Sequence, residues 1–188
     1  QINMEEMRYS EASNGFSQLI QERPNSPFIP YALEGRAVAN FSMQNYPQTA
    51  SDYQQILKSY PNAENAETAL KGLQETLAIQ GKSADFGDYL DNYKSANPTS
   101  GSIQSLEYEA AKALYFDKTF EKAIPAFENY LRSYPQSAQR IEAVYFLGDS
   151  YFQTNDTEAA LAQFRLLEQE QASPQRLRAM QRIGQIEL

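Results

Sequence analysis

The chain has 188 residues, a formal net charge of −8, and neither histidine nor cysteine. The lack of these two residue types excludes imidazole-based acid–base catalysis, thiol nucleophiles and the common zinc sites, and with them most classes of enzyme. The acidic balance, without a basic stripe interleaved with aromatic residues, argues against a nucleic-acid or anionic-membrane surface. No apolar run approaches the ~18 residues of a membrane span.

A repeat of 37 residues runs along the chain. It is marked by four evenly spaced prolines, Pro24, Pro61, Pro98 and Pro135. The residue eight positions before each proline is large and apolar, and this column continues after the last proline. Its members are Phe16, Tyr53, Leu90, Phe127 and Phe164. Further apolar columns are spaced by three, four and eight residues, which places them on single helical faces. A period of this length is typical of a solenoid, in which each unit buries its apolar face against its neighbours.

In chain order, the pattern predicts a lone second helix within a partial repeat of residues 1–24. Helical hairpins follow at 25–61, 62–98, 99–135 and 136–173, and a lone first helix forms a partial repeat at 174–188. Ser26 before Pro27 and Ser173 before Pro174 are expected to be N-caps followed by proline in the first turn. The repeat at 62–98 diverges, with Phe86 at a position that is small in most units and Gln74 where a glycine is expected.

The repeat at 136–173 resembles the tetratricopeptide (TPR) family. The matching residues are Val144, Leu147, Gly148, Tyr151, Ala160 and Phe164. The resemblance implies an all-α fold, a right-handed α-solenoid of about ten helices. Tyr60-Pro61 and Tyr134-Pro135 make the chain similar to TPR proteins of bacterial envelopes, among them the Tol-Pal-associated periplasmic TPR protein and the TPR lipoprotein of the outer-membrane barrel-assembly machine. This likeness implies the periplasm, or the periplasmic face of the outer membrane.

In TPR arrays the first helix of each hairpin lines a concave groove, and the resemblance implies which side chains point into it. The expected partner-binding residues are Tyr31, Phe41, Lys71, Tyr108, Lys112, Tyr115, Tyr145, Asp149 and Phe152. Glu34, Val38, Glu75 and Glu142 share this face. Tyrosine gives large, stiff contact area with a polar tip and is enriched at interfaces. The alternative is that several of these rings fill the packing between repeats.

Two non-catalytic roles follow from this pattern. The first is a scaffold that binds a protein or peptide through aromatic contacts in the groove, with no cofactor and no metal. The second is a structural spacer or self-assembly module. It is suggested by Phe16 and Leu19 at one end and Ile183 and Ile186 at the other, which lie on apolar faces where a capping repeat would be polar. We therefore expect the chain to be a segment of a longer array.

Overall fold

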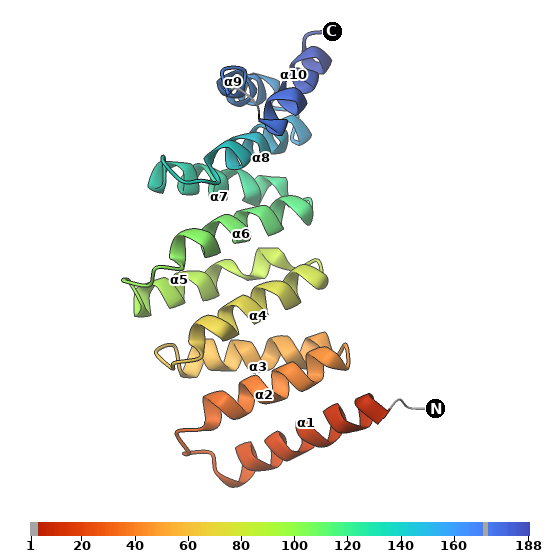
Figure 1. Cartoon of the computed structure of the whole chain (residues 1–188), viewed down its shortest axis with the longest axis vertical. Coiled ribbons are helices and arrows are strands. Elements are labelled where there is room, and N and C mark those ends of the chain that lie inside the picture. Colours follow the sequence, from red (N-terminus) through yellow and green to blue (C-terminus); the bar gives the residue numbers. More distant parts are fainter. Residues whose placement is uncertain (1–3, 171–172) are drawn as a thin grey trace. The chain divides into compact units, whose positions relative to one another are not determined.

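The computed structural model describes residues 4–170 and 173–188, and within these ranges it contains helices and no strand (Figure 1). Ten α-helices and one short 3-10 helix, η1, make up this part of the chain. Their bounds are α1 (Met4–Glu22), α2 (Ile29–Ser42), α3 (Tyr46–Ser59), α4 (Ala66–Ile79), η1 (Ser83–Asp85), α5 (Gly87–Ala96), α6 (Ile103–Phe116), α7 (Phe120–Ser133), α8 (Arg140–Gln153), α9 (Thr157–Leu167) and α10 (Pro174–Ile186). The expected all-α fold is confirmed.

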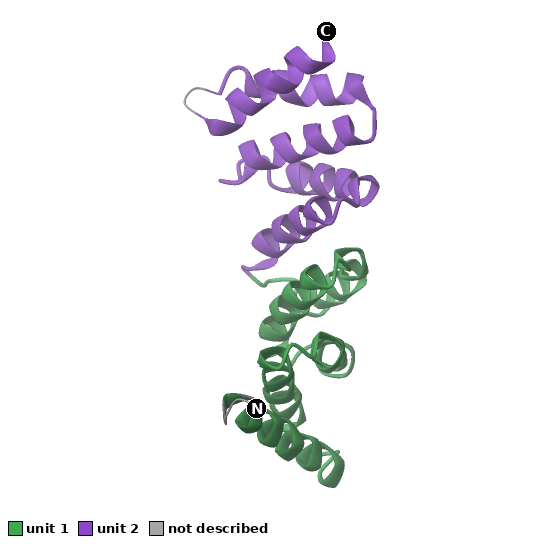
Figure 2. Cartoon of the chain, turned by 90° about the vertical axis from the view of Figure 1, so that its right-hand side faces the viewer, with its two compact units in different colours: residues 1–100 green, residues 101–188 purple. Residues whose placement is uncertain are grey.

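The helices form two compact units, residues 1–100 with α1 to α5 and residues 101–188 with α6 to α10 (Figure 2). Within each unit, every helix packs against the next helix in the sequence. The expectation of one continuous array over residues 1–188, with the repeat boundaries given above, therefore stays a prediction.

The evenly spaced prolines stand just beyond the end of every second helix. Helices α3, α5 and α7 have as C-caps Tyr60, Asn97 and Tyr134, each with φ between −136° and −130°, and a proline follows each of them. A residue before proline is sterically excluded from the helical region, and proline itself has no amide hydrogen to continue the helix. The proline rhythm of the sequence thus sets where these helices stop.

The turn between the two helices of a hairpin also recurs every 37 residues. Gln44, Gly81, Lys118 and Asn155 all have a positive φ, between 58° and 65°. This left-handed conformation costs an ordinary L-residue about 1–2 kcal/mol and costs glycine little. Because the same position adopts it each time, the chain reverses direction in the same way in all four turns.

One of the two expected N-caps is confirmed. The hydroxyl of Ser173 accepts a hydrogen bond from the Gln175 amide at 3.2 Å, with Pro174 in the first turn of α10. The expectation for Ser26 is wrong, because α2 begins only at Ile29 and lacks a side-chain cap. The Ser26 hydroxyl instead accepts a hydrogen bond from the Phe28 amide at 3.2 Å, within the turn that precedes the helix.

Glycines allow aromatic rings of the repeated column to approach a neighbouring helix closely. A Cβ atom on Gly72 would lie 2.5 Å from the ring of Tyr53, and one on Gly148 would lie 2.8 Å from the ring of Phe164. In the 62–98 repeat the glycine of close approach is therefore Gly72 and not position 74, where the TPR pattern placed it. The position equivalent to Gly72 in α8 is Phe146, whose ring is stacked at 5.9 Å on that of Phe127.

The divergence of the 62–98 repeat has a visible consequence. The side chain of Phe86 is buried at the position that Thr49, Ala123 and Ala160 occupy in the other second helices. Here η1 takes the place of the first helical turn, and α5 begins only at Gly87, after Phe86. A large ring at a position of tight helix crossing thus accompanies a shorter second helix.

Candidate partner-binding surface

Helix α2 presents exposed apolar side chains at the expected groove positions. Tyr31 is 43% exposed and Val38, two turns further along the same side of the helix, is 51% exposed. Phe41 is half-buried, with its ring edge-on to that of Tyr46 at 5.5 Å. Since Tyr31 and Val38 are exposed together, this side of α2 is available for contact.

Helix α4 adds charged groups to the same unit. Lys71 and Glu75 are exposed one turn apart, and Lys71 Nζ lies 2.6 Å from Glu67 Oε1. The pair between Lys71 and Glu67 is solvent-exposed and of the i,i+4 type, so it contributes little to stability and leaves the ammonium group accessible. We call Tyr31, Val38, Phe41, Lys71 and Glu75 the α2–α4 surface.

Hydrogen bonds fix the beginning of α4 beside the beginning of α2. The buried Asn65 Nδ2 donates to the Pro30 carbonyl at 2.9 Å and to Glu34 Oε2 at 2.8 Å. The Tyr31 hydroxyl donates to Glu64 Oε2 at 2.7 Å. These contacts hold the N-terminal ends of α2 and α4 next to each other, although the two helices are far apart in sequence. The two helices that carry the α2–α4 surface are therefore neighbours at their N-terminal ends.

In the second unit, the structure corrects three of the expected groove residues, because Tyr108, Tyr145 and Asp149 are buried. The ring of Tyr108 packs on that of Tyr130, 5.4 Å away. Lys112 is half-buried, with its Nζ 5.5 Å from the centre of the Tyr108 ring. Tyr108 thus packs within its own hairpin. The ring of Tyr115 on α6 lies 4.6 Å from that of Phe146 on α8, and this packing between hairpins is the alternative that the sequence left open.

The side chain of Asp149 is the centre of a polar cluster. It is 1% exposed and accepts from Arg182 Nε at 2.7 Å and from the Tyr115 hydroxyl at 2.8 Å. Burial, together with the hydrogen bond to the Asp149 carboxylate, raises the pKa of Tyr115 above its ordinary value. The cluster ties α6, α8 and α10 together.

Arginines of α10 cover the groove positions of α8. The guanidinium of Arg182 lies 4.6 Å from the centre of the half-buried Phe152 ring, and that of Arg178 lies 5.9 Å from the centre of the Tyr145 ring. The side of α8 where a partner was expected is therefore occupied by the next helix of the same chain. Of the nine expected residues, six remain at least partly accessible.

A second buried carboxylate was missed in the sequence. Asp52 on α3 accepts two hydrogen bonds from Arg36 on α2, from Nε at 3.0 Å and from Nη2 at 2.6 Å, while Arg36 Nη1 donates to the Ser17 hydroxyl on α1 at 3.1 Å. A bidentate arginine–carboxylate pair is among the strongest side-chain interactions. The available signal was a charged residue on the buried face of α3, between Thr49 and Ile56.

Tyrosine hydroxyls also bond to carboxylates of a neighbouring helix, within one hairpin for Tyr134 and between two hairpins for Tyr151. Tyr134 donates to Glu107 at 2.6 Å and Tyr151 to Glu128 at 2.7 Å. Desolvation by burial, with these hydrogen bonds, raises the pKa of each tyrosine to about 12. The raised pKa means that the neutral hydroxyl is favoured in the folded state.

Because the pKa of Tyr134 is raised in the folded state, we expect the protein to lose stability at alkaline pH. The stabilisation from Tyr134 is fully present below the unfolded pKa of about 10 and disappears as the pH rises through the folded pKa of about 12. The urea midpoint of Tyr134→Phe should therefore fall less than that of the parent chain between pH 9 and pH 12. Glu107→Gln should reduce the same difference. Equal pH profiles for Tyr134→Phe and the parent chain would contradict the linkage.

In the described ranges, no helix is both long enough and apolar enough to cross a membrane.

Comparison with protein families gives two matches. The model of the family YfiO, described as outer membrane lipoprotein, matches residues 74–185, and a tetratricopeptide repeat model, TPR_6, matches residues 31–63. A curated relative is the outer membrane protein assembly factor BamD of Xylella fastidiosa (strain 9a5c), 23% identical over 180 residues. That alignment covers 79% of this chain and 62% of the relative.

Solved structures of other TPR-like proteins are similar in fold. A putative kinesin light chain of Podosopora anserina with nearly identical TPR-like repeats has a TM-score of 0.56 at 14% identity, covering 88% of this chain and 90% of the other. MamA from Desulfovibrio magneticus RS-1 has a TM-score of 0.51 at 18% identity, covering 92% of this chain and 100% of the other. TPR-like arrays of this kind are protein-interaction scaffolds. Since the YfiO model matches more than half of its residues, the chain belongs to this family of TPR-containing outer membrane lipoproteins.

Proposed function

We propose that the chain is a non-catalytic scaffold that binds an extended or helical protein segment on the α2–α4 surface. The observation that carries this proposal is the exposure of Tyr31 and Val38 on one side of α2, beside the accessible charges of α4. Apolar anchors surrounded by polar groups are the usual composition of a peptide-binding groove. In the second unit, the half-buried Lys112 and Tyr115 of α6 are separate candidate contact residues.

The family supports a location at the periplasmic face of the outer membrane. Its relative in Xylella fastidiosa is named for the assembly of outer membrane proteins, and this chain spans 62% of that relative's length. We propose a partner of the same class: an unfolded outer membrane protein, whose strands present alternating apolar side chains to Tyr31 and Val38 while their polar groups face Lys71 and Glu75.

The test is a fluorescence titration with a urea-unfolded outer membrane β-barrel protein as the probe. Val38→Glu combined with Tyr31→Ala removes both apolar anchors and puts a charge in the place of one of them, so binding should weaken about tenfold or more. Both residues are exposed, Tyr31 by 43% and Val38 by 51%, and the circular dichroism of the variant should match that of the parent chain.

Leu166→Glu is the matched control, because Leu166 is an exposed apolar side chain on α9 of the second unit and is not part of the α2–α4 surface. The control should bind as the parent chain does. Unchanged binding in the α2 double variant, or equal weakening in both variants, would rule out the α2–α4 surface as the binding site.

A further inference from the structure

Helix α1 has a face that no other described helix covers. Leu19 is 38% exposed, and Ala12, two turns earlier, is also exposed. The residues 37 positions further on, Ile56 and Thr49, are fully buried on α3. The same holds for the equivalent pairs on α7 and α9, which are Tyr130 with Ala123 and Leu167 with Ala160. In these hairpins the first helix provides the cover.

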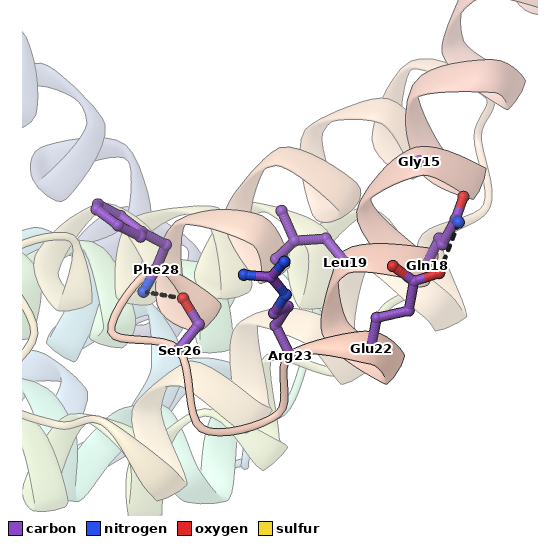
Figure 3. A pocket seen from close by; sticks show the side chains of 7 residues that line it. All are labelled: Gly15, Gln18, Leu19, Glu22, Arg23, Ser26 and Phe28. Atoms are coloured by element: carbon purple, nitrogen blue, oxygen red, sulfur yellow. Dashed lines mark hydrogen bonds between the residues drawn. The ribbon is translucent and has the colours of Figure 1, made fainter.

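An open pocket of about 440 Å³ lies on this face of α1 (Figure 3). Gly15 and Leu19 line it from the helix, and Arg23 and Phe28 line it from the turn that follows and the start of α2. The ring of Phe28 is itself largely exposed. The pocket is thus a depression of suitable position to receive side chains from a helix laid along α1.

Helix α10 also has an uncovered apolar side, and in the repeat it occupies the place of a first helix, whereas α1 occupies that of a second helix. Leu177 is 72% exposed and Met180 is 48% exposed, one turn apart on the same side. The residues equivalent to Met180 are buried in every other first helix of a hairpin. They are Ala32, Ala69, Leu106 and Ala143. In those helices the cover is the second helix of the hairpin, and α10 has no such partner among the described residues.

The hairpin of α2 and α3 shows how two such faces fit. Its helices are joined by the ion pair of Arg36 and Asp52. Counting by 37, the position of Asp52 corresponds to Gly15 on α1, and the position of Arg36 corresponds to Gly184 on α10. A Cβ atom on either glycine would have no neighbour within 4 Å. A helical glycine costs about 1 kcal/mol relative to alanine, and close helix contact is a reason to keep one.

The charges of the two helices are complementary as well. Helix α1 contains four glutamates and one arginine, whereas α10 contains three arginines and no acidic residue. One of the three, Arg182, is already paired with Asp149 of α8, so Arg176 and Arg178 carry the positive charge that α10 can offer to a second copy. Opposite charges on two surfaces favour their encounter and disfavour pairing of either surface with itself.

From these observations we infer that α10 of one copy docks antiparallel on α1 of a second copy and completes a hairpin of the α2–α3 kind. Leu177 and Met180 then cover Leu19, and Gly184 faces Gly15. The contact is heterologous, because each copy contributes a different face, so association can continue from copy to copy. It uses neither Tyr31 nor Val38 and does not depend on the proposed binding function.

Sedimentation velocity of the whole chain tests this inference. The average mass of the parent chain should rise between about 1 µM and about 1 mM. Leu19→Glu disables the α1 face and Leu177→Glu disables the α10 face, and each variant alone should remain a monomer. A mixture of the two should form a dimer and no larger species, because Leu19→Glu keeps an intact α10 and Leu177→Glu keeps an intact α1.

Val38→Glu is the control and should associate as the parent chain does. All the changed residues are exposed, and circular dichroism verifies that each variant is folded. A parent chain that stays monomeric over the whole range would overturn the inference. So would self-association of either single variant, since that requires a contact of like faces, and so would a mixture that stays monomeric.

Discussion

Replacing Arg182 by methionine is expected to lower the free energy of unfolding by about 3 kcal/mol, because it leaves a buried carboxylate without its counter-ion. The Asp149 side chain is 1% exposed and its remaining strong partner is the Tyr115 hydroxyl. Methionine keeps most of the length of the arginine stem, so that the charge is the principal loss. Urea unfolding at pH 7 measures the effect.

Two further variants separate this effect from general damage to α10. Adding Asp149→Asn to Arg182→Met removes the uncompensated charge, so the double variant should be more stable than Arg182→Met alone. Arg165→Met breaks a more exposed pair, Arg165 with Glu187 at 3.2 Å, and should cost no more than about 0.5 kcal/mol. If Arg165→Met cost as much as Arg182→Met, burial of Asp149 would not be the cause.

Gly72→Ala is expected to destabilise the first unit by about 1–3 kcal/mol, although alanine is the better helix former. The new Cβ atom would lie 2.5 Å from the ring of Tyr53, which is buried between α3 and its neighbours and can move only by repacking them. The midpoint of thermal or urea unfolding reports the change.

Gly15→Ala is the matched control for Gly72→Ala. Gly15 also lies within a helix, but a Cβ atom there would meet nothing within 4 Å. At low protein concentration, where copies do not associate, Gly15→Ala should raise stability by up to about 1 kcal/mol. The two changes are chemically identical, and opposite signs would show that the Tyr53 ring makes the difference. A stabilising Gly72→Ala would contradict the close packing of the Tyr53 ring on Gly72.

The helices and their faces were predictable from the sequence because the 37-residue period, the prolines and the apolar spacing all report local geometry. The burial of an individual side chain on a first helix could not be predicted in this way. Tyr145 and Tyr31 share the expected groove face, yet Tyr145 is buried and Tyr31 is exposed. The difference arises from the next repeat: α10 places Arg178 over Tyr145, whereas Tyr31 bonds to Glu64 in the turn before α4. Such contacts depend on side-chain packing between repeats, which spacing alone does not encode.

The polar cluster around Asp149 could not be predicted from the sequence for a related reason. Asp149 was recognised as a first-helix residue, but its partner Arg182 lies 33 positions away, and no local spacing indicates that the two side chains meet. The glycine of close approach in the 62–98 repeat was misplaced by two positions because the TPR pattern marks contact within a hairpin. Gly72 instead receives the Tyr53 ring from the preceding hairpin.

The four left-handed turn residues, Gln44, Gly81, Lys118 and Asn155, have a consequence for how such a chain changes its length. A crossover that joins one of these turns to another removes or duplicates a whole number of 37-residue blocks and leaves the turn at the junction with its original backbone conformation. Recombination at these points preserves the register of every helix on both sides. The array can therefore be lengthened or shortened in evolution, or by design, without the invention of a new connection.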